Sequence, residues 1–329
     1  MSEIYYSEVI GTGHSVPPRI LTNQDLEKIV DTTDEWILSR TGIKERHIAD
    51  ENTSASTLAS EASRIALRRA GILPDEIDLV LVATVTPDMP FPSTSAIVQS
   101  NIGAINAAVM DVSAGCTGFI YGLSMADSYI KSGMFKTILV VGVEILSKVT
   151  DWTDRSTCIL FGDGAGAVVL RATTEKIGIL GTFIKADGRH GNLLMMPGGG
   201  SVNPASQKSV DLRLHFLKMS GNEVFKVAVR SMNEATQKIL DKTGLKAEDI
   251  NMLIPHQANL RIIKATADRL KIPKEKVYVN IQRYGNTSSA SIPIALDEIR
   301  SNGNYKSSSP LLLVAFGAGF TWGSAAITW

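Results

Sequence analysis

Three short segments contain side chains that could support covalent acyl chemistry, and the first is built around Cys116. In AAVMDVSAGCTGF (107–119) a short apolar run and a turn of small residues precede the cysteine. Apolar residues then recur at helical spacing, so we expect Cys116 at or near a helix N-terminus. The helix dipole and free backbone N–H groups favour an anion there, so this placement predicts a lowered thiol pKa and a better nucleophile. A buried structural cysteine is the alternative interpretation.

His256 and Asn286 are the candidate partners of that cysteine. His256 follows an apolar run in LIPHQAN, and Asn286 lies in YGNTSSAS, a small polar turn before a predicted helix. Either residue alone is commonly structural, because a lone histidine is usually a surface or capping residue and asparagine often caps a helix. A cysteine, a histidine and an asparagine at strand ends together form a set suited to covalent acyl transfer.

Self-similar segments predict that these distant residues meet. Three pairs of segments occur in the same order along the chain: 62–83 and 235–256, Gly115-Cys116 and Gly285-Asn286, 161–170 and 316–327. Such a repeat predicts two similar α/β halves, residues 1–172 and 173–329. Equivalent strand ends of duplicated units meet near their pseudo-twofold axis, so we expect Cys116, His256 and Asn286 to line one central pocket.

Composition argues against several classes of function. The 329 residues are 44% hydrophobic and 20% charged, as in ordinary globular proteins. Lys plus Arg and Asp plus Glu both number 33, so no net charge favours binding to nucleic acid or to an acidic membrane. MSEIYYSEVIGTG has no signal-peptide pattern, no apolar stretch reaches membrane-spanning length, and two cysteines make no disulfide framework. These features predict a cytoplasmic protein.

Residue patterns also predict individual elements. We expect strands at 8–13 and 79–85, and helices at 23–30, 34–39, 57–70 and 95–102. Residues 40–49 are expected to form a basic, exposed segment, and Cys158 to be a core residue in an apolar strand. FGDGAG (161–166) lacks the Gly-Lys-Ser/Thr ending of a phosphate loop, so we expect a tight turn between close-packed elements.

In its motifs the sequence resembles the β-ketoacyl-(acyl carrier protein) synthase III family, which are condensing enzymes of the thiolase superfamily. The matching stretches run over essentially the whole chain: TTDEWILSRTGIKERHI (32–48), DVSAGCTGF (111–119), DRSTCILFGDGAGAVVL (154–170), IPHQAN (254–259), RYGNTSSASIPIAL (283–296) and AFGAGFTWGSA (315–325). The resemblance implies an α/β, thiolase-like duplicated fold, in which two similar α/β halves form a layered αβαβα core.

For the three candidate residues the resemblance implies a catalytic sequence. Cys116 accepts an acyl group from acyl-CoA, and His256 and Asn286 bind the thioester carbonyl of malonyl-(acyl carrier protein). Decarboxylation gives an enolate that attacks the acyl-cysteine, producing 3-ketoacyl-(acyl carrier protein), CO2 and CoA. This reaction initiates type II fatty acid synthesis. The CoA thioester is a substrate, and no cofactor or metal is implied.

The resemblance also implies an oxyanion loop near the C-terminus. Backbone N–H groups of Cys116 and of the loop Gly317, Ala318 and Gly319 would hold the tetrahedral oxygen. The family usually has Gly-Gly-Gly where this chain has Ala318 in the middle. Alanine is strained where φ is positive, so we expect a compatible backbone angle at Ala318 and retained function.

For CoA, the resemblance implies that Trp36 and Arg155 lie on either side of the adenine. Thr32 and Arg40 are nearby candidates, and Asn259 is expected to form a hydrogen bond in the pantetheine tunnel. From the residues alone we would instead place Trp36 in a helix core and treat Arg155 as a solvated loop charge.

A carrier protein and a second copy of the chain are the implied macromolecular partners. Residues 257–276 carry six basic and two acidic residues, and we expect Gln257, Arg261 and Lys264 to contact an acidic carrier protein. A solvated helix face is the usual explanation for such a run. Phe91 matches a residue that reaches the acyl pocket of the neighbouring subunit, so the resemblance implies a homodimer.

Other functions stay open at this point. The nearest is a related acyltransferase of secondary metabolism with the same fold. From a different class, Cys116 and His256 could act as a cysteine-dependent acyl-thioester hydrolase. A non-catalytic acyl-binding protein is the third alternative, and it predicts that Cys116→Ser leaves function intact.

Overall fold

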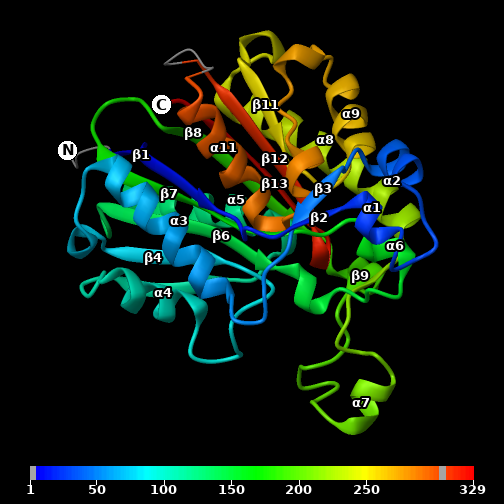
Figure 1. Cartoon of the computed structure of the whole chain (residues 1–329). Coiled ribbons are helices and arrows are strands. Elements are labelled where there is room, and N and C mark those ends of the chain that lie inside the picture. Colours follow the sequence, from blue (N-terminus) through cyan, green and yellow to red (C-terminus); the bar gives the residue numbers. More distant parts are fainter. Residues whose placement is uncertain (1–4, 304–308) are drawn as a thin grey trace.

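Two large β-sheets form the centre of the molecule, as the computed structural model of residues 5–303 and 309–329 shows (Figure 1). The first sheet contains, in spatial order, β1 (Tyr6–Ser15), β7 (Asp163–Thr173), β6 (Thr137–Ile145), β4 (Leu79–Ala83) and β5 (Ala108–Val112). The second contains β11 (Met252–Pro255), β12 (Leu311–Gly317), β13 (Thr321–Ile327) and β8 (Ile179–Ala186). Two short pairs accompany them: β2 (Ile20–Thr22) with β3 (Glu45–His47), and β9 (Leu194–Met195) with β10 (Lys218–Met219).

The two sheets repeat one pattern of strand directions. In the first, β1 and β7 are antiparallel, β7 and β6 are antiparallel, and β6 and β4 are parallel. In the second, β8, β13, β12 and β11 follow the same sequence of directions. The parallel partner β5 has a counterpart in the isolated parallel bridge between Leu253 and Val277. The predicted duplication of an α/β unit is therefore confirmed.

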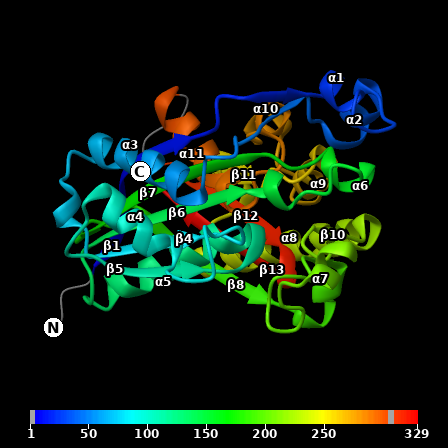
Figure 2. The same ribbon diagram turned by 60° about the horizontal axis from the view of Figure 1, so that its bottom comes forward.

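Helices lie outside each sheet and between the two sheets (Figure 2). The longer helices are α2 (Asp34–Thr41), α3 (Ala55–Ala70), α4 (Thr94–Ile102), α5 (Gly118–Lys131), α8 (Gly221–Thr243), α9 (Leu260–Arg269) and α11 (Ser291–Ser301). The shorter ones are α1 (Asn23–Leu26), α6 (Arg155–Cys158), α7 (Gln207–Asp211) and α10 (Ile281–Tyr284). Helix α3 covers the first sheet and α8 the second, while α5 and α11 contact both, which gives the αβαβα order. In the described residues, no helix combines the length and apolarity needed to cross a membrane.

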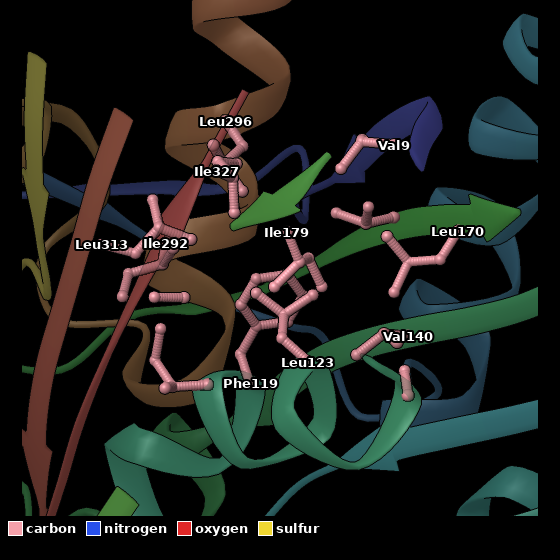
Figure 3. Packing of buried hydrophobic residues seen from close by; sticks show 14 of the residues in the cluster. Val9, Phe119, Leu123, Val140, Leu170, Ile179, Ile292, Leu296, Leu313 and Ile327 are labelled. Atoms are coloured by element: carbon pink, nitrogen blue, oxygen red, sulfur yellow. The ribbon is translucent and has the colours of Figure 1, made fainter. Parts of the chain in front are cut away.

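The core between the sheets holds α5 and α11 in place (Figure 3). Phe119 and Leu123 of α5 and Ile292 and Leu296 of α11 are each at most 1% exposed. Burial of one such side chain contributes about 1.5 to 3 kcal/mol relative to exposure. Because Phe119 lies in the first turn of α5, this packing also fixes the segment immediately before that helix, which contains Cys116.

Arg46 shows where sequence patterns mispredicted local surroundings. The segment 40–49 was expected to be exposed, yet Arg46 is 0% exposed. Its guanidinium donates to the carbonyl oxygens of Leu21 at 3.1 Å and Ile159 at 2.8 Å, and to Asn23 Oδ1 at 2.9 Å. The backbone oxygens replace water around the charge, and burial still lowers the pKa of Arg46 to about 10.

Two further predictions need correction in part. Cys158 is a core residue, at 0% exposure, but it ends helix α6 and does not lie in a strand. The glycines of FGDGAG do serve close packing, because a Cβ at Gly166 would lie 2.7 Å from atoms of Pro293 and Ile294. They lie mainly within strand β7, however, and form no tight turn.

An arm extends from the body between β9 and β10 and carries α7 at its tip (Figure 1). Its return segment contacts the body through Arg213, whose guanidinium donates to both carboxylate oxygens of Asp151, at 2.5 and 3.0 Å. The guanidinium holds the pKa of the Asp151 carboxyl well below its usual range. The base of the arm therefore lies against the loop that precedes α6.

Candidate active site

Cys116 lies between strand β5 and helix α5, as the strand–turn–helix pattern predicted. It occupies a single 3-10 turn, Gly115–Thr117, that leads into α5. Gly115 has φ +54°, and a Cβ there would lie 2.6 Å from the backbone nitrogen of Ala318. Glycine is thus required both for the backbone angle and for the close approach of the C-terminal loop.

The prediction of a lowered Cys116 pKa is wrong. Burial raises the pKa of the Cys116 thiol to about 11, and the nearby Glu144 carboxylate raises it further. Hydrogen bonds from Ser288 and from the backbone N–H groups of Cys116 and Ala318 lower it, but desolvation is the larger effect. The residue as a whole is partly exposed.

His256 follows β11 directly and is held as a neutral hydrogen-bond donor. Its backbone N–H donates to Val314 O at 2.8 Å, and its side chain is 2% exposed. Burial lowers the pKa of His256 to about 3. Its Nδ1 lies 2.7 Å from Ser291 Oγ, which also accepts the N–H of Gln257 at 3.4 Å. We assign the Ser291 hydroxyl as the donor and Nδ1 as the acceptor of this bond. The ring proton is then on Nε2, which can donate into the cavity.

Asn286 is fixed by backbone contacts on both sides. Its N–H donates to Leu160 O at 2.8 Å, and its carbonyl accepts the N–H of Gly162 at 3.1 Å. Its Oδ1 accepts the N–H of Ser288 at 2.9 Å, so Nδ2 is the end of the amide that can donate elsewhere. Gly285, with φ 65° and ψ −157°, supplies a conformation essentially restricted to glycine.

One cavity joins these three residues, although they come from different elements of the two halves. Its volume is about 690 Å³, and Cys116, His256 and Asn286 all line it. Further predicted site residues on its wall are Trp36, Arg40, Asn259, Arg261 and Gly317. In the described chain the remaining ones lie off this wall: Thr32, Phe91, Arg155, Gln257, Lys264, Ala318 and Gly319. A second hollow, of about 480 Å³ beside Lys148 and Trp152, contains none of the three.

Two guanidinium groups lie over the ring of Trp36, which lines the cavity. The Cζ atoms of Arg40 and Arg155 are 4.7 and 5.1 Å from the centroid of its ring. Arg155 also donates to the backbone oxygen of Asp31 at 2.9 Å. Because 5.1 Å is a direct contact distance, Arg155 must move away before a base can insert between it and Trp36.

Gln257 does not belong to an exposed binding surface, contrary to the prediction for this residue. It is 1% exposed, and its amide nitrogen donates to Pro255 O at 2.7 Å and to Tyr278 O at 3.2 Å. Its amide oxygen accepts the N–H groups of Asn280 and Ile281 at 3.1 and 3.2 Å. All its hydrogen-bonding capacity holds neighbouring backbone in place, so it has none left for a partner.

The C-terminal loop accommodates alanine without strain at its middle position. Positive φ values occur at Gly319, 74°, and at Phe320, 50°, whereas Ala318 is not among the positive-φ residues. Gly317 is extended, at φ −156°. A Cβ on Gly317 would collide with the backbone of Cys116, so this position demands glycine for space. The expectation of a compatible angle at Ala318 is confirmed.

Three polar residues at the site escaped the sequence analysis: Glu144, Ser288 and Ser291. Glu144 is 0% exposed on β6, and burial raises its pKa to about 7. Ser288 donates to Glu144 and lowers the pKa of the nearby Cys116 thiol, and Ser291 lies against His256 Nδ1. The available signal for Glu144 was a single charge within the apolar run TILVVGVEI.

Solved structures with the same architecture establish the class of protein. A 3-oxoacyl-[acyl-carrier-protein] synthase III from Aquifex aeolicus matches with a TM-score of 0.91 at 50% identity, over 98% of this chain and 100% of that one. A priming β-ketosynthase of the R1128 polyketide biosynthetic pathway matches with a TM-score of 0.92 at 37% identity, over 100% and 97% of the two chains. The fold is therefore thiolase-like.

Sequence similarity then identifies the family. The β-ketoacyl-[acyl-carrier-protein] synthase III of Caldanaerobacter subterraneus subsp. tengcongensis is 54% identical over 329 residues, which is 100% of this chain and 99% of that protein. The family model for 3-oxoacyl-[acyl-carrier-protein] synthase III matches residues 110–188, and the model for its C-terminal part matches residues 240–329. The chain belongs to the β-ketoacyl-[acyl-carrier-protein] synthase III family, a family of acyltransferases.

Proposed function

We propose that this chain starts fatty acid synthesis by condensing an acyl group from acyl-CoA with malonyl-(acyl carrier protein), and that Cys116, His256 and Asn286 carry out the chemistry. The observation that carries the proposal is the convergence of the three side chains on one cavity. We also propose that the chain divides into two halves. Residues 1–172 supply Cys116, and residues 173–329 supply His256 and Asn286.

The proposed first step transfers the acyl group to Cys116. The backbone N–H groups of Cys116 and Ala318 both lower the pKa of the Cys116 thiol, which places them near the sulfur. In this position they can donate to the oxygen of the tetrahedral intermediate that forms when the sulfur attacks a thioester carbonyl. A rigid pair of donors needs no reorganisation during the reaction, and removal of one such donor typically costs about 10² to 10³ in rate.

The proposed second step uses His256 and Asn286 on the malonyl thioester. Loss of CO2 places negative charge on the thioester oxygen, and the Nε2–H of His256 and the Nδ2–H2 of Asn286 can both donate to it. The lowered pKa of His256 supports this role, because a neutral ring keeps its proton as a hydrogen-bond donor. The enolate carbon then attacks the acyl-Cys116 thioester, and the thiolate leaves.

CoA is proposed to bind in the cavity against Trp36, with Arg155 closing over the base. Arg40 and Asn259 also line the cavity, and Asn259 Nδ2 donates to Arg40 O at 3.1 Å. A stacked aromatic pair contributes about 0.5 to 1.5 kcal/mol, so Trp36→Ala should raise the KM for acyl-CoA about 2- to 12-fold.

The carrier protein is proposed to dock on helix α9 beside the cavity. Arg261 and Lys264 are exposed and lie three residues apart, so they share one face of the helix. Arg261→Glu and Lys264→Glu should raise the KM for malonyl-carrier protein and weaken its dependence on salt. Lys264 lies off the cavity wall, so Lys264→Glu should also leave acyl-CoA use unchanged. Lys274→Glu, an exposed charge beyond α9, is the matched control.

A homodimer is proposed to form along strand β5, the edge of the first sheet. Val109 and Met110 are 36% and 39% exposed there, an unprotected apolar edge that favours pairing with a second copy. Phe91 is 84% exposed, which suits insertion into the partner's acyl pocket. Light scattering should show a dimer that Val109→Lys dissociates. Phe91→Ala should leave the dimer intact and change the preferred acyl chain.

Intact-protein mass spectrometry tests the chemistry directly. We expect an acyl adduct on Cys116 after mixing with acetyl-CoA or a branched acyl-CoA, and its loss as ketoacyl-carrier protein forms. Absence of an adduct from every acyl-CoA would remove Cys116 as the acceptor. An adduct cleared by water alone would identify a hydrolase, and function retained in Cys116→Ser would identify an acyl-binding protein.

A priming role in secondary metabolism is the second candidate, favoured by the match to the priming β-ketosynthase of a polyketide pathway. The preferred acyl adduct and the carrier protein that discharges it distinguish the two pathways. For either role we propose a cytoplasmic location, in which Cys116 and Cys158 would stay reduced.

A further inference from the structure

A buried carboxyl group lies beside Cys116, and the chemistry described above gives it no role. Glu144 is 0% exposed near the end of strand β6. Its Oε2 accepts the hydroxyl of Thr86 at 2.7 Å and the backbone N–H of Val85 at 3.1 Å. These contacts hold the carboxyl in one orientation next to the nucleophile.

Ser288 connects this carboxyl to the cysteine. Its Oγ donates to Glu144 Oε1 at 3.1 Å, and the same hydroxyl lies near enough to the Cys116 thiol to lower the pKa of that thiol. Ser288 has φ +47°, a left-handed conformation that is rare and unfavourable for serine. Its backbone N–H meanwhile holds Asn286 Oδ1. The strained backbone angle of Ser288 thus places this one residue next to Glu144, the Cys116 thiol and Asn286.

We propose that Cys116 and Glu144 share one proton through the Ser288 hydroxyl, so that Glu144 accepts the thiol proton when Cys116 attacks an acyl thioester. This inference rests on the proposed role of Cys116 as acyl acceptor. Glu144 acts through Ser288 and does not touch the substrate, so it is a positioning residue for the nucleophile.

The proposed step conserves protons without an external reagent. The Cys116 S–H bond breaks as sulfur bonds to the acyl carbon, and its proton passes to Ser288 Oγ while the serine proton passes to the Glu144 carboxylate. The carbonyl π pair moves to the oxygen and returns as the bond to the CoA sulfur breaks. The proton stored on Glu144 then goes back through Ser288 to the departing CoA thiolate, giving acyl-Cys116 and CoA–SH.

Electrostatics supports a shared proton, because two neighbouring negative charges in a buried site cannot both form easily. Burial raises the pKa of Glu144 to about 7 and the pKa of Cys116 to about 11. His256, which lines the same cavity, is neutral above about pH 3. On the adjacent strand β7, the Asp163 carboxylate accepts hydrogen bonds from the hydroxyl and the backbone N–H of Ser147, at 2.5 and 2.9 Å. Between about pH 7 and pH 11 the pair therefore holds one proton.

A shared proton has a distinctive pH signature. Above the pKa of Glu144, the Cys116–Glu144 pair holds one proton, which is either on the sulfur or on the carboxyl. The ratio of these two forms does not depend on pH, so the fraction of protein with a Cys116 thiolate and a neutral Glu144 becomes constant. The reactivity of Cys116 should therefore stop rising above about pH 7 until the doubly charged form becomes significant. An isolated thiol instead gains about tenfold in thiolate per pH unit throughout this range.

Alkylation by iodoacetamide, followed by intact-protein and peptide mass spectrometry from pH 6 to about pH 9, measures this signature. In the wild-type protein we expect the Cys116 rate to level off near pH 7. In Glu144→Gln we expect it to keep rising about tenfold per unit. Glu144→Asp should restore the plateau. Ser289→Ala, which removes a different 3.0 Å hydrogen bond to Oε1, is the matched control and should keep it.

A wild-type rate that rises about tenfold per pH unit from pH 6 to pH 9 would overturn the proposal without any variant. A plateau that survives in Glu144→Gln would overturn it too, because another group would then hold the proton. The assay needs neither acyl-CoA nor carrier protein, so it separates this inference from the proposed function. If Cys116 showed the plateau but never formed an acyl adduct, the acyl-acceptor role would fail instead.

Discussion

Removal of the Ser291 hydroxyl should impair condensation selectively, because Ser291 sets the proton position on His256. Ser291 Oγ lies 2.7 Å from His256 Nδ1 in a fully buried contact. Ser291→Ala leaves Nδ1 without its donor. The tautomer with the proton on Nδ1 can then compete with the tautomer that carries it on Nε2. In that tautomer Nε2 presents a lone pair to the enolate oxygen, which repels it.

The size of the effect follows from the burial of the histidine. A buried polar atom that loses its partner costs about 1 to 3 kcal/mol. If this amount is lost from transition-state stabilisation, the condensation rate falls about 5- to 150-fold. Acylation of Cys116 by acyl-CoA does not use His256 in the proposed mechanism, so its rate should change less than about twofold.

Single-turnover kinetics of the two half-reactions test this reasoning. Acyl-Cys116 formation is followed by mass spectrometry, and product release by addition of malonyl-carrier protein to preformed acyl-enzyme. Ser289→Ala is the control, because Ser289 Oγ donates to Ala83 O at 2.9 Å and has no bond to His256. Equal losses in both half-reactions of Ser291→Ala, or an unchanged condensation rate, would refute the tautomer argument.

Three further perturbations have expected outcomes. Ala318→Gly should leave the turnover rate within about twofold and lower the unfolding free energy by about 0.4 to 1 kcal/mol in denaturant melts, because alanine fits its angle and restricts the unfolded chain. Gly115→Ala should destabilise by about 1 to 3 kcal/mol and slow acylation, because φ +54° and a 2.6 Å approach to Ala318 both exclude a Cβ. The folded pKa of Glu144 is raised from 4.5 to about 7, so its stabilising contribution is present below pH 4.5 and lost as the pH rises through 7. As the pH rises from 5 to 8, the unfolding free energy of wild type should therefore fall by about 2 to 3 kcal/mol relative to that of Glu144→Gln, as measured by chemical denaturation.

The duplicated fold could be predicted because it leaves a signal in one sequence. Matching glycines and apolar runs recur in the two halves, and the strand-end rule then brings Cys116, His256 and Asn286 together although they are far apart in the chain. Their convergence on one cavity agrees with that prediction. The catalytic roles, the CoA and carrier-protein contacts and the domain boundary stay predictions.

Properties that depend on burial could not be predicted in the same way. The pattern before α5 correctly placed Cys116 just before a helix, but it contained no measure of how far the thiol is removed from water. Desolvation outweighs the hydrogen-bond donors near the thiol and raises its pKa. Gln257 was misassigned for a similar reason, because its four backbone partners at Pro255, Tyr278, Asn280 and Ile281 come partly from a segment more than 20 residues away.

Glu144 shows which kind of sequence signal deserves more weight. All nine residues of β6 are buried, so no alternation of polar and apolar residues reveals where the carboxyl points. The hydroxyls that meet it belong to Ser288 and Ser289, 144 and 145 positions further along the chain. A charge in a wholly buried strand is costly unless several donors surround it, and such donors can come only from tertiary structure. A single acidic residue inside an apolar strand that ends near a nucleophile is therefore a candidate for proton transfer on the strength of its sequence position alone.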